Sequence, residues 1–151
     1  MDYKSITKKK GFLYRGISNN DYIVSKHRGY FWSVSRDVIG LYFSDDPYTA
    51  ECYSEKLTLK GKTSTPNRPN YIVVYSKRDL PKLLTGKNMK SFVEFCKKVD
   101  TIQKKDDIHY QMIFKRYVSG DDHLFIGKLS FGKAKEIYEY RPMLNSWLRI
   151  K

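Results

Sequence analysis

Three polar residues stand inside apolar, strand-like segments of this chain, and their types suit a common site. They are Arg15 in FLYRGI, Ser44 in LYFSDD and Glu136 in AKEIYEYRP. Burying such a group without a partner costs on the order of a few kcal/mol, so each one needs a reason. The Arg15 guanidinium could clamp an anion, with Gly16 letting a ligand approach the backbone. The Ser44 hydroxyl could orient that ligand or a catalytic carboxylate.

The local pattern leaves a plain structural interpretation open for each of these residues. Arg15 can be an outward-facing strand residue, because strand faces alternate. Ser44 can be a turn residue at the end of a strand, and no GxSxG motif surrounds it, which argues against a hydrolase nucleophile. Glu136 and Glu139 can both be solvated; being three apart in a strand, they point to opposite faces, so at most one faces a given cleft.

The cysteines and histidines give no sign of a metal site or a disulfide. Cys52 and Cys96 lie outside any CxxC pair, and no histidine stands at metal-ligand spacing to either. His27, His109 and His123 occur in dissimilar contexts, so a ribonuclease that uses them as acid and base is the least favoured enzyme class. No apolar run is long enough to span a membrane, and the first residues lack the apolar core of a signal peptide, so we expect a cytoplasmic protein.

The elements that must position the three residues can be predicted from apolar periodicity and from the residues that favour turns and helix caps. We predict strands at 11–17, 29–35, 40–44, 71–76 and 135–142, with a turn at 19–21 and a loop at 61–70. Asp46 as N-cap and Pro47 at the first helical position predict a helix over 47–55. An apolar stripe predicts a helix near 89–99, and a second helical piece follows at 107–118. This order favours a single α+β domain over residues 1–151.

The charge points to the kind of partner. The net charge is +13 and aromatic residues make up 15% of the chain. Between Lys56 and Lys98 eleven Lys or Arg face two acids, Asp79 and Glu94. We therefore expect an acidic or nucleic-acid-associated macromolecular target, docked by this basic middle segment, and no membrane partner.

The order and contexts of three motifs resemble one family. LYRG near the start, LYFSDDPYTAECY and EIYEYRP close to the end are similar to the ADP-ribosyltransferase fold family, of the Arg-Ser-Glu bacterial toxin and phage kind. GLYFS followed by a helix with a tyrosine also resembles the poly-ADP-ribose polymerase branch. The resemblance implies an α+β fold of split mixed β-sheets with peripheral helices. It also implies NAD as the substrate that donates ADP-ribose, with no metal required.

The resemblance also implies roles for particular residues. Arg15 would contact the phosphates and ribose of NAD, Ser44 would help to hold the catalytic carboxylate or the ribose, and Glu136 would be catalytic. Gly16 would give backbone contacts to the nicotinamide. Aromatic walls of its pocket would come from Tyr42, Phe43 or Tyr53. Breaking the nicotinamide–ribose bond builds positive charge on the ribose, which a carboxylate stabilises.

Two features depart from the family pattern. Ala134 stands where many arginine-modifying members carry Gln or Glu, which argues against arginine as the acceptor or against activity. The motif serine could instead be Ser33 or Ser35 of FWSVS.

Two functions of different classes therefore remain open. The first is NAD-dependent ADP-ribosyl transfer to a protein or nucleic acid, by a monomeric phage protein aimed at host transcription or translation machinery. The second is non-enzymatic binding of nucleic acid. Segments such as YSKRDL, FKRYV and KHRGYFW interleave cations with aromatics, as phosphate contacts and base stacking require.

Overall fold

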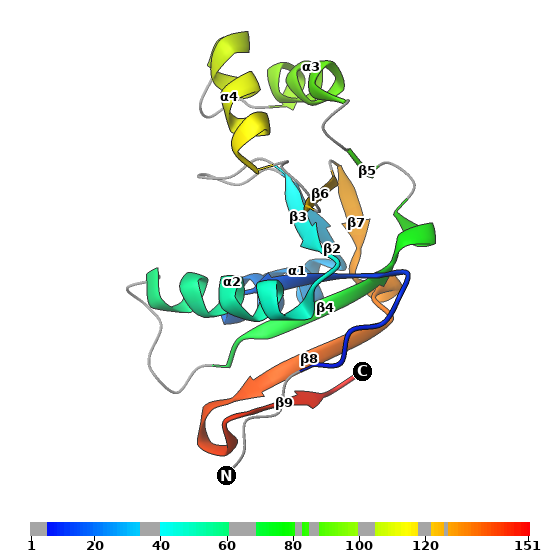
Figure 1. Cartoon of the computed structure of the whole chain (residues 1–151), viewed down its shortest axis with the longest axis vertical. Coiled ribbons are helices and arrows are strands. Elements are labelled where there is room, and N and C mark those ends of the chain that lie inside the picture. Colours follow the sequence, from blue (N-terminus) through cyan, green and yellow to red (C-terminus); the bar gives the residue numbers. More distant parts are fainter. Residues whose placement is uncertain are drawn as a thin grey trace.

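A seven-stranded antiparallel sheet forms the centre of the protein in a computed structural model, which describes residues 6–33, 40–60, 69–80, 83–84, 88–99, 105–117, 122–125 and 127–151. Its strand order is β5-β6-β3-β1-β4-β8-β9 (Figure 1). The strand bounds are Phe12–Ile17 (β1), Leu41–Ser44 (β3), Tyr71–Ser76 (β4), Leu83–Leu84 (β5), Asp122–Phe125 (β6), Glu136–Arg141 (β8) and Ser146–Arg149 (β9). A separate two-stranded sheet pairs β2 (Tyr30–Trp32) with β7 (Lys128–Ser130).

Helices cover both faces of the large sheet. The bounds are Asn19–Arg28 (α1), Pro47–Lys60 (α2), Met89–Val99 (α3) and Asp107–Tyr117 (α4), with short 3₁₀ turns at Lys77–Asp79 (η1), Phe131–Lys133 (η2) and Pro142–Leu144 (η3). In Figure 1, α2 crosses one face of the sheet, α1 lies behind the other, and α3 and α4 pack together above. None of the described helices is long and apolar enough to cross a membrane.

Each face of the sheet carries its own apolar cluster. On the face that α1 covers, here the α1 face, Leu13, Val73 and Tyr75 pack with Tyr22 of α1. The Tyr22 ring stacks on Tyr71, with centroids 3.7 Å apart. The opposite face, here the α2 face, is covered by α2 and is packed by a second cluster, which contains Ile6, Tyr14, Ala50, Ile72, Val74 and Trp147. A third cluster joins α3 and α4 to β6 through Phe92, Cys96, Phe114 and Leu124.

Local capping explains where α1 and α2 begin. Asp46 caps α2, since its carboxylate accepts from the backbone N–H of Tyr48 at 3.1 Å, as the sequence predicted. The predicted turn at 19–21 is wrong, because α1 begins there. Ser18 is its N-cap and accepts from the backbone N–H of Asp21 at 3.2 Å. Gly29 ends α1 in the left-handed conformation, with φ of 89°.

The α+β class is confirmed, but the sheets differ from the expected mixed kind. All strand pairs among the described residues are antiparallel. No pattern in the residues had specified strand direction; that expectation came from the family resemblance alone. The predicted helices at 89–99 and 107–118 are confirmed as α3 and α4. The predicted loop at 61–70 lies outside the described residues except for its last two positions.

Candidate functional site

The register of the sheet places Ser44 and Glu136 on one face, at opposite ends of a row across four strands. Ser44 of β3 faces Tyr14 of β1, Tyr14 faces Val74 of β4, and Val74 faces Glu136 of β8. Directly opposed residues point to the same side, so all four lie on the α2 face. Three strand spacings separate Ser44 from Glu136, about 14 Å. Tyr14 and Val74, 1% and 0% exposed, fill the row between them.

Arg15 lies on the other face. It is the neighbour of Tyr14 in β1, and it opposes Val73, which in turn opposes Ile137. Neighbouring residues of a strand point to opposite sides, so the Arg15 side chain belongs to the α1 face. The sheet therefore separates Arg15 from both Ser44 and Glu136. The structure does not bring the three predicted site residues to one cleft.

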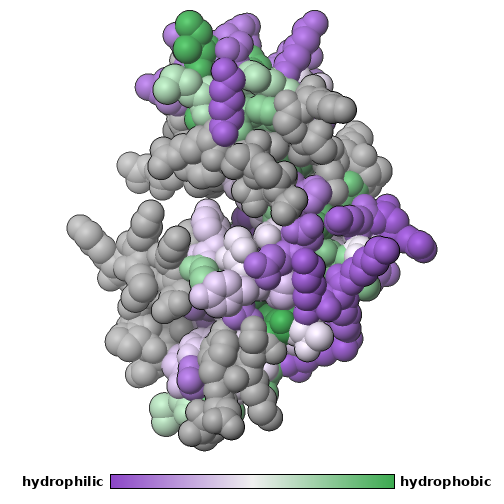
Figure 2. All heavy atoms as spheres, viewed as in Figure 1, coloured by the Kyte–Doolittle hydropathy of each residue, from purple (hydrophilic) through white to green (hydrophobic). Residues whose placement is uncertain are grey.

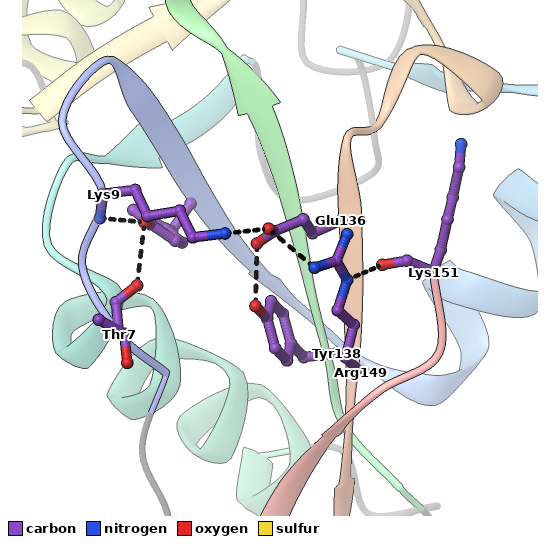
Figure 3. Close-up of polar contacts among 7 residues, drawn as sticks. Thr7, Lys9, Glu136, Tyr138, Arg149 and Lys151 are labelled. Carbon is purple, nitrogen blue, oxygen red and sulfur yellow. Dashed lines mark hydrogen bonds and ion pairs between the residues drawn. The ribbon is translucent and has the colours of Figure 1, made fainter.

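Glu136 forms the centre of a polar cluster at the start of β8 (Figure 3). Its carboxylate accepts from Lys9 Nζ at 2.5 Å and from the Tyr138 hydroxyl at 2.9 Å. Arg149 Nη1 lies 3.4 Å from the same carboxylate. The Glu136 side chain is 7% exposed, while Lys9 and Arg149 are about half exposed. Through these contacts Glu136 links the segment before β1 and the end of β9 to β8. Its role in this structure is therefore to stabilise the fold.

The same contacts set the ionisation of the cluster. Burial raises the pKa of Glu136, but the hydrogen bonds from Lys9 and Tyr138 and the charges of Lys9 and Arg149 outweigh it and hold that pKa below its usual value. Burial, followed by the hydrogen bond to Glu136, raises the pKa of Tyr138 to about 12. Glu136 is therefore held as a carboxylate that two cations already neutralise, so little of its charge is left to stabilise a cationic transition state.

Ser44 acts as a turn residue in this structure. Its hydroxyl accepts from the backbone N–H of Asp46 at 3.1 Å, at the joint where β3 leads into α2. The alternative Ser33 is buried, and its hydroxyl accepts from the backbone N–H of Gly127 at 2.7 Å. Ser35 lies outside the described residues. Both described serines thus bond to nearby backbone, which accounts for their burial.

The other predicted ligand contacts have packing roles or lie apart from Arg15. A Cβ added to Gly16 would lie 2.2 Å from the Ala50 carbonyl oxygen and 2.8 Å from Ser54 N, so α2 occupies the place that a ligand would need. Phe43 is 2% exposed and packs edge-on against Tyr75 in the α1-face core. Tyr53 is 37% exposed on α2, across the sheet from Arg15.

Arg15 is the one predicted site residue whose environment is incomplete among the described residues. Its Nη1 donates to the Tyr42 carbonyl at 3.3 Å, and its Nη2 lies 3.7 Å from Asp21. Both contacts are long for a charged group. Its buried Nε has no hydrogen-bond partner in the described structure, although the side chain is only 12% exposed. A buried guanidinium held this loosely can accept a further anion.

A group of cations that sequence reasoning missed lies at one end of the sheet. The chain enters β1, leaves β4, enters β8 and leaves β9 at this end, as the antiparallel registers require. Nine exposed cations belong to these segments, and we call them the basic sheet end: Lys8, Lys9, Lys10, Lys77, Arg78, Lys133, Lys135, Arg149 and Lys151. Figure 2 shows hydrophilic side chains gathered on the right of the view, where Figure 1 places the end of β4.

The basic middle segment predicted from sequence does not form one surface in its described part. Lys77 and Arg78 belong to the basic sheet end, whereas Lys90, Lys97 and Lys98 lie on α3. Six of its eleven cations are at positions that the structure does not describe or whose side chains it leaves undescribed. Short runs such as KKK before β1 and KR after β4 could have indicated the basic sheet end, but only with the strand order known.

Comparisons with known proteins identify no relative. No family model matches this chain, and neither does any curated protein or any solved structure. Among the described residues, no group of three or more His, Cys, Asp or Glu side chains could hold a metal ion. The candidate site therefore rests on the geometry of Arg15 and of the basic sheet end.

Proposed function

We propose that this chain binds nucleic acid through the phosphate backbone, at the basic sheet end. One observation carries the proposal: nine exposed cations from four separate segments meet at one end of four neighbouring strands. Rows of phosphates are the natural partner for such a surface, because each neutralised phosphate releases condensed counterions. A nucleic-acid partner also agrees with the net charge of +13. The location that goes with this proposal is the cytoplasm.

The charge balance at this end supports an external anion. Among the described residues of the four segments the acids are Asp79 and Glu136, which leaves a formal side-chain charge of +7. Both acids already form ion pairs, Asp79 with Lys135 and Glu136 with Lys9 and Arg149. The remaining six cations have no acidic partner in the described structure: Lys8, Lys10, Lys77, Arg78, Lys133 and Lys151.

The surroundings indicate the mode of binding. Asp45 and Asp46 follow the adjacent strand β3, so the positive surface is bounded on that side. The large aromatic side chains exposed in the described structure are Tyr48 and Tyr53, both on α2 rather than at the basic sheet end. The basic sheet end therefore offers phosphate contacts without base stacking. Binding there should depend on salt and hardly on sequence.

The test compares two double charge reversals by fluorescence anisotropy on a labelled 20-base-pair duplex. Lys77→Glu with Arg78→Glu changes the basic sheet end, and Lys90→Glu with Lys98→Glu makes the same change of charge on α3. We expect the first variant to lose most of the affinity and the second to bind within about threefold of wild type. Equal losses would mean that net charge, not this surface, drives binding, and would refute the proposed site.

NAD-dependent ADP-ribosyl transfer, with an ADP-ribosyltransferase-like fold, is a second candidate function. The observation that favours it is Arg15, a largely buried guanidinium whose contacts are long and whose Nε has no partner among the described residues, since a guanidinium with donors to spare suits a pyrophosphate. The separation of Glu136 from Arg15 argues that Glu136 is not its catalytic carboxylate. The test is transfer of label from NAD to proteins or nucleic acids of a cell lysate, with Arg15→Lys beside wild type.

A further inference from the structure

A pocket of about 300 Å³ opens between α2 and the β8–β9 hairpin on the α2 face. Helix α2 supplies Tyr48 and Cys52, and the hairpin supplies Tyr140, Asn145 and Trp147. This volume is at the lower end of the range for small-molecule sites. The pocket is independent of Arg15, which lies on the other face, and of the basic sheet end.

The lining suits a flat aromatic ligand. Tyr48 lines the α2 wall of the pocket and is 65% exposed. On the opposite wall the rings of Tyr140 and Trp147 lie 5.2 Å apart at 50° to each other. Aromatic faces stack on planar heterocycles, and amide side chains such as Asn145 pair with their polar edges.

Asn145 lines the pocket and provides a hydrogen-bond donor there. Its Oδ1 accepts from the Tyr140 hydroxyl at 2.6 Å, which turns its NH₂ group away from Tyr140. Its backbone has φ of 46°, a left-handed conformation that asparagine tolerates better than most residues. The turn between β8 and β9 therefore holds an amide donor in one orientation beside two aromatic rings.

We infer that this pocket binds a nucleobase, with the base stacked against the aromatic walls and its edge accepting from Asn145. The inference rests on the proposed function for the source of the base, since it makes the pocket a second contact for the same nucleic-acid strand. Glu136 at the basic sheet end and Tyr140 at the pocket are four residues apart on β8, roughly 14 Å. A single strand could thus place phosphates on the first and a base in the second.

Tryptophan fluorescence can report on the pocket directly. The chain has two tryptophans, so Trp32→Phe leaves Trp147 as the reporter. The probes are AMP, ribose 5-phosphate, a labelled single-stranded 12-mer and the duplex of the same sequence. We expect AMP and the single strand to quench Trp147, and the sugar phosphate and the duplex to leave it unchanged. If only AMP quenches Trp147, the pocket is a site for free nucleotides. If only the single strand quenches it, the pocket binds a base whose flanking phosphates are also bound.

Three substitutions in the same background locate the ligand. Asn145→Asp keeps the acceptor for Tyr140 but removes the donor, and Tyr48→Ala removes one wall. Each should weaken the affinity for AMP, measured by the Trp147 response, about tenfold, which is the usual size of one lost stacking or base-edge contact. The matched control is Tyr53→Ala, which removes another exposed tyrosine of α2 that does not line the pocket, and it should bind like wild type.

The outcomes separate this inference from the proposed function. If neither AMP at millimolar concentration nor the single strand affects Trp147, the nucleobase pocket is refuted, while duplex binding at the basic sheet end can still stand. If AMP quenches Trp147 but no nucleic acid binds in the Lys77 and Arg78 experiment, the proposed function fails and the pocket remains a nucleotide site. Equal weakening by Tyr53→Ala would also refute the assignment.

Discussion

Arg15 and Glu136 lie on opposite faces of the seven-stranded sheet, although only one strand, β4, lies between β1, which carries Arg15, and β8, which carries Glu136. Arg15 opposes Val73, while Glu136 opposes the next residue, Val74. A shift of one residue in register would have placed both on the same face, because the side-chain period of a strand is two. Because of this single-residue offset, Arg15 and Glu136 lie in separate environments and do not share a cleft.

Glu136→Gln should destabilise the protein by about 1–3 kcal/mol near pH 7, since it removes charged hydrogen bonds to Lys9 and weakens the contact with Arg149. The folded-state pKa of Glu136 lies below its usual value. A lowered pKa stabilises the fold above the unfolded-state value near 4.5, and this stabilisation is lost as pH falls through the folded-state pKa. The difference between variant and wild type should therefore shrink as pH falls below the unfolded-state value. Urea denaturation from pH 3 to 8 measures it.

Glu94→Gln is the matched control for that experiment. Glu94 is exposed on α3, and the same change there should leave the unfolding free energy within about 0.5 kcal/mol of wild type. A difference for Glu136→Gln that stays constant from pH 3 to 8 would contradict the assigned role of the charge.

The sequence predicted local elements well where a pattern repeats. The apolar, β-branched run of β4 and the apolar stripe of α3 gave correct elements, and Asp46 with Pro47 gave the start of α2. Helix α1 was missed because only Tyr22 and Ser25 are buried on it, too few to produce a helical stripe. Ser18 and Asp21 three residues later were the available signal, an N-cap followed by an acid in the first turn.

The candidate site was not predictable in the same way. Residue types singled out Arg15 and Glu136 as polar groups in apolar, strand-like segments, but the face of each depends on register across β1, β4 and β8. The basic sheet end depends on strand order, because Lys9 and Lys135 are far apart in sequence. They lie at the same end of the sheet since β1 and β8 both pair with β4. Neither register nor strand order follows from local propensity.

Gly16→Ala should lower the free energy of unfolding by roughly 1–3 kcal/mol, because the new methyl group meets backbone rather than a flexible side chain. The added Cβ would lie 2.2 Å from the Ala50 carbonyl oxygen, so α2 must move away from β1. Gly132→Ala is the control, since its Cβ would meet nothing closer than 3.8 Å. Urea denaturation of both variants gives the comparison. A neutral Gly16→Ala would show that α2 does not pack on β1 this closely, and would reopen that place for a ligand.

Nucleic-acid binding should fall steeply with salt. If the six cations without acidic partners each contact one phosphate, the slope of log K against log salt concentration is about −5 on duplex DNA. Lys77→Glu with Arg78→Glu should make that slope shallower by about 2. Anisotropy titrations between 50 and 300 mM NaCl measure both slopes. A wild-type slope near zero would contradict phosphate binding at the basic sheet end, whatever the affinity at low salt.

The Arg15→Met variant tests whether Arg15 binds an anion or stabilises the fold. A buried guanidinium without close partners adds little to stability, and an unbranched apolar side chain can fill its place, so the unfolding free energy should stay within about 1 kcal/mol of wild type. Asp21, which loses its partner, is 38% exposed and can be hydrated. If Arg15 holds the pyrophosphate of NAD, millimolar NAD should raise the melting temperature of wild type and Glu136→Gln but not of Arg15→Met. A loss of several kcal/mol in Arg15→Met without NAD would instead make Arg15 a structural residue, and the second candidate function would lose its support.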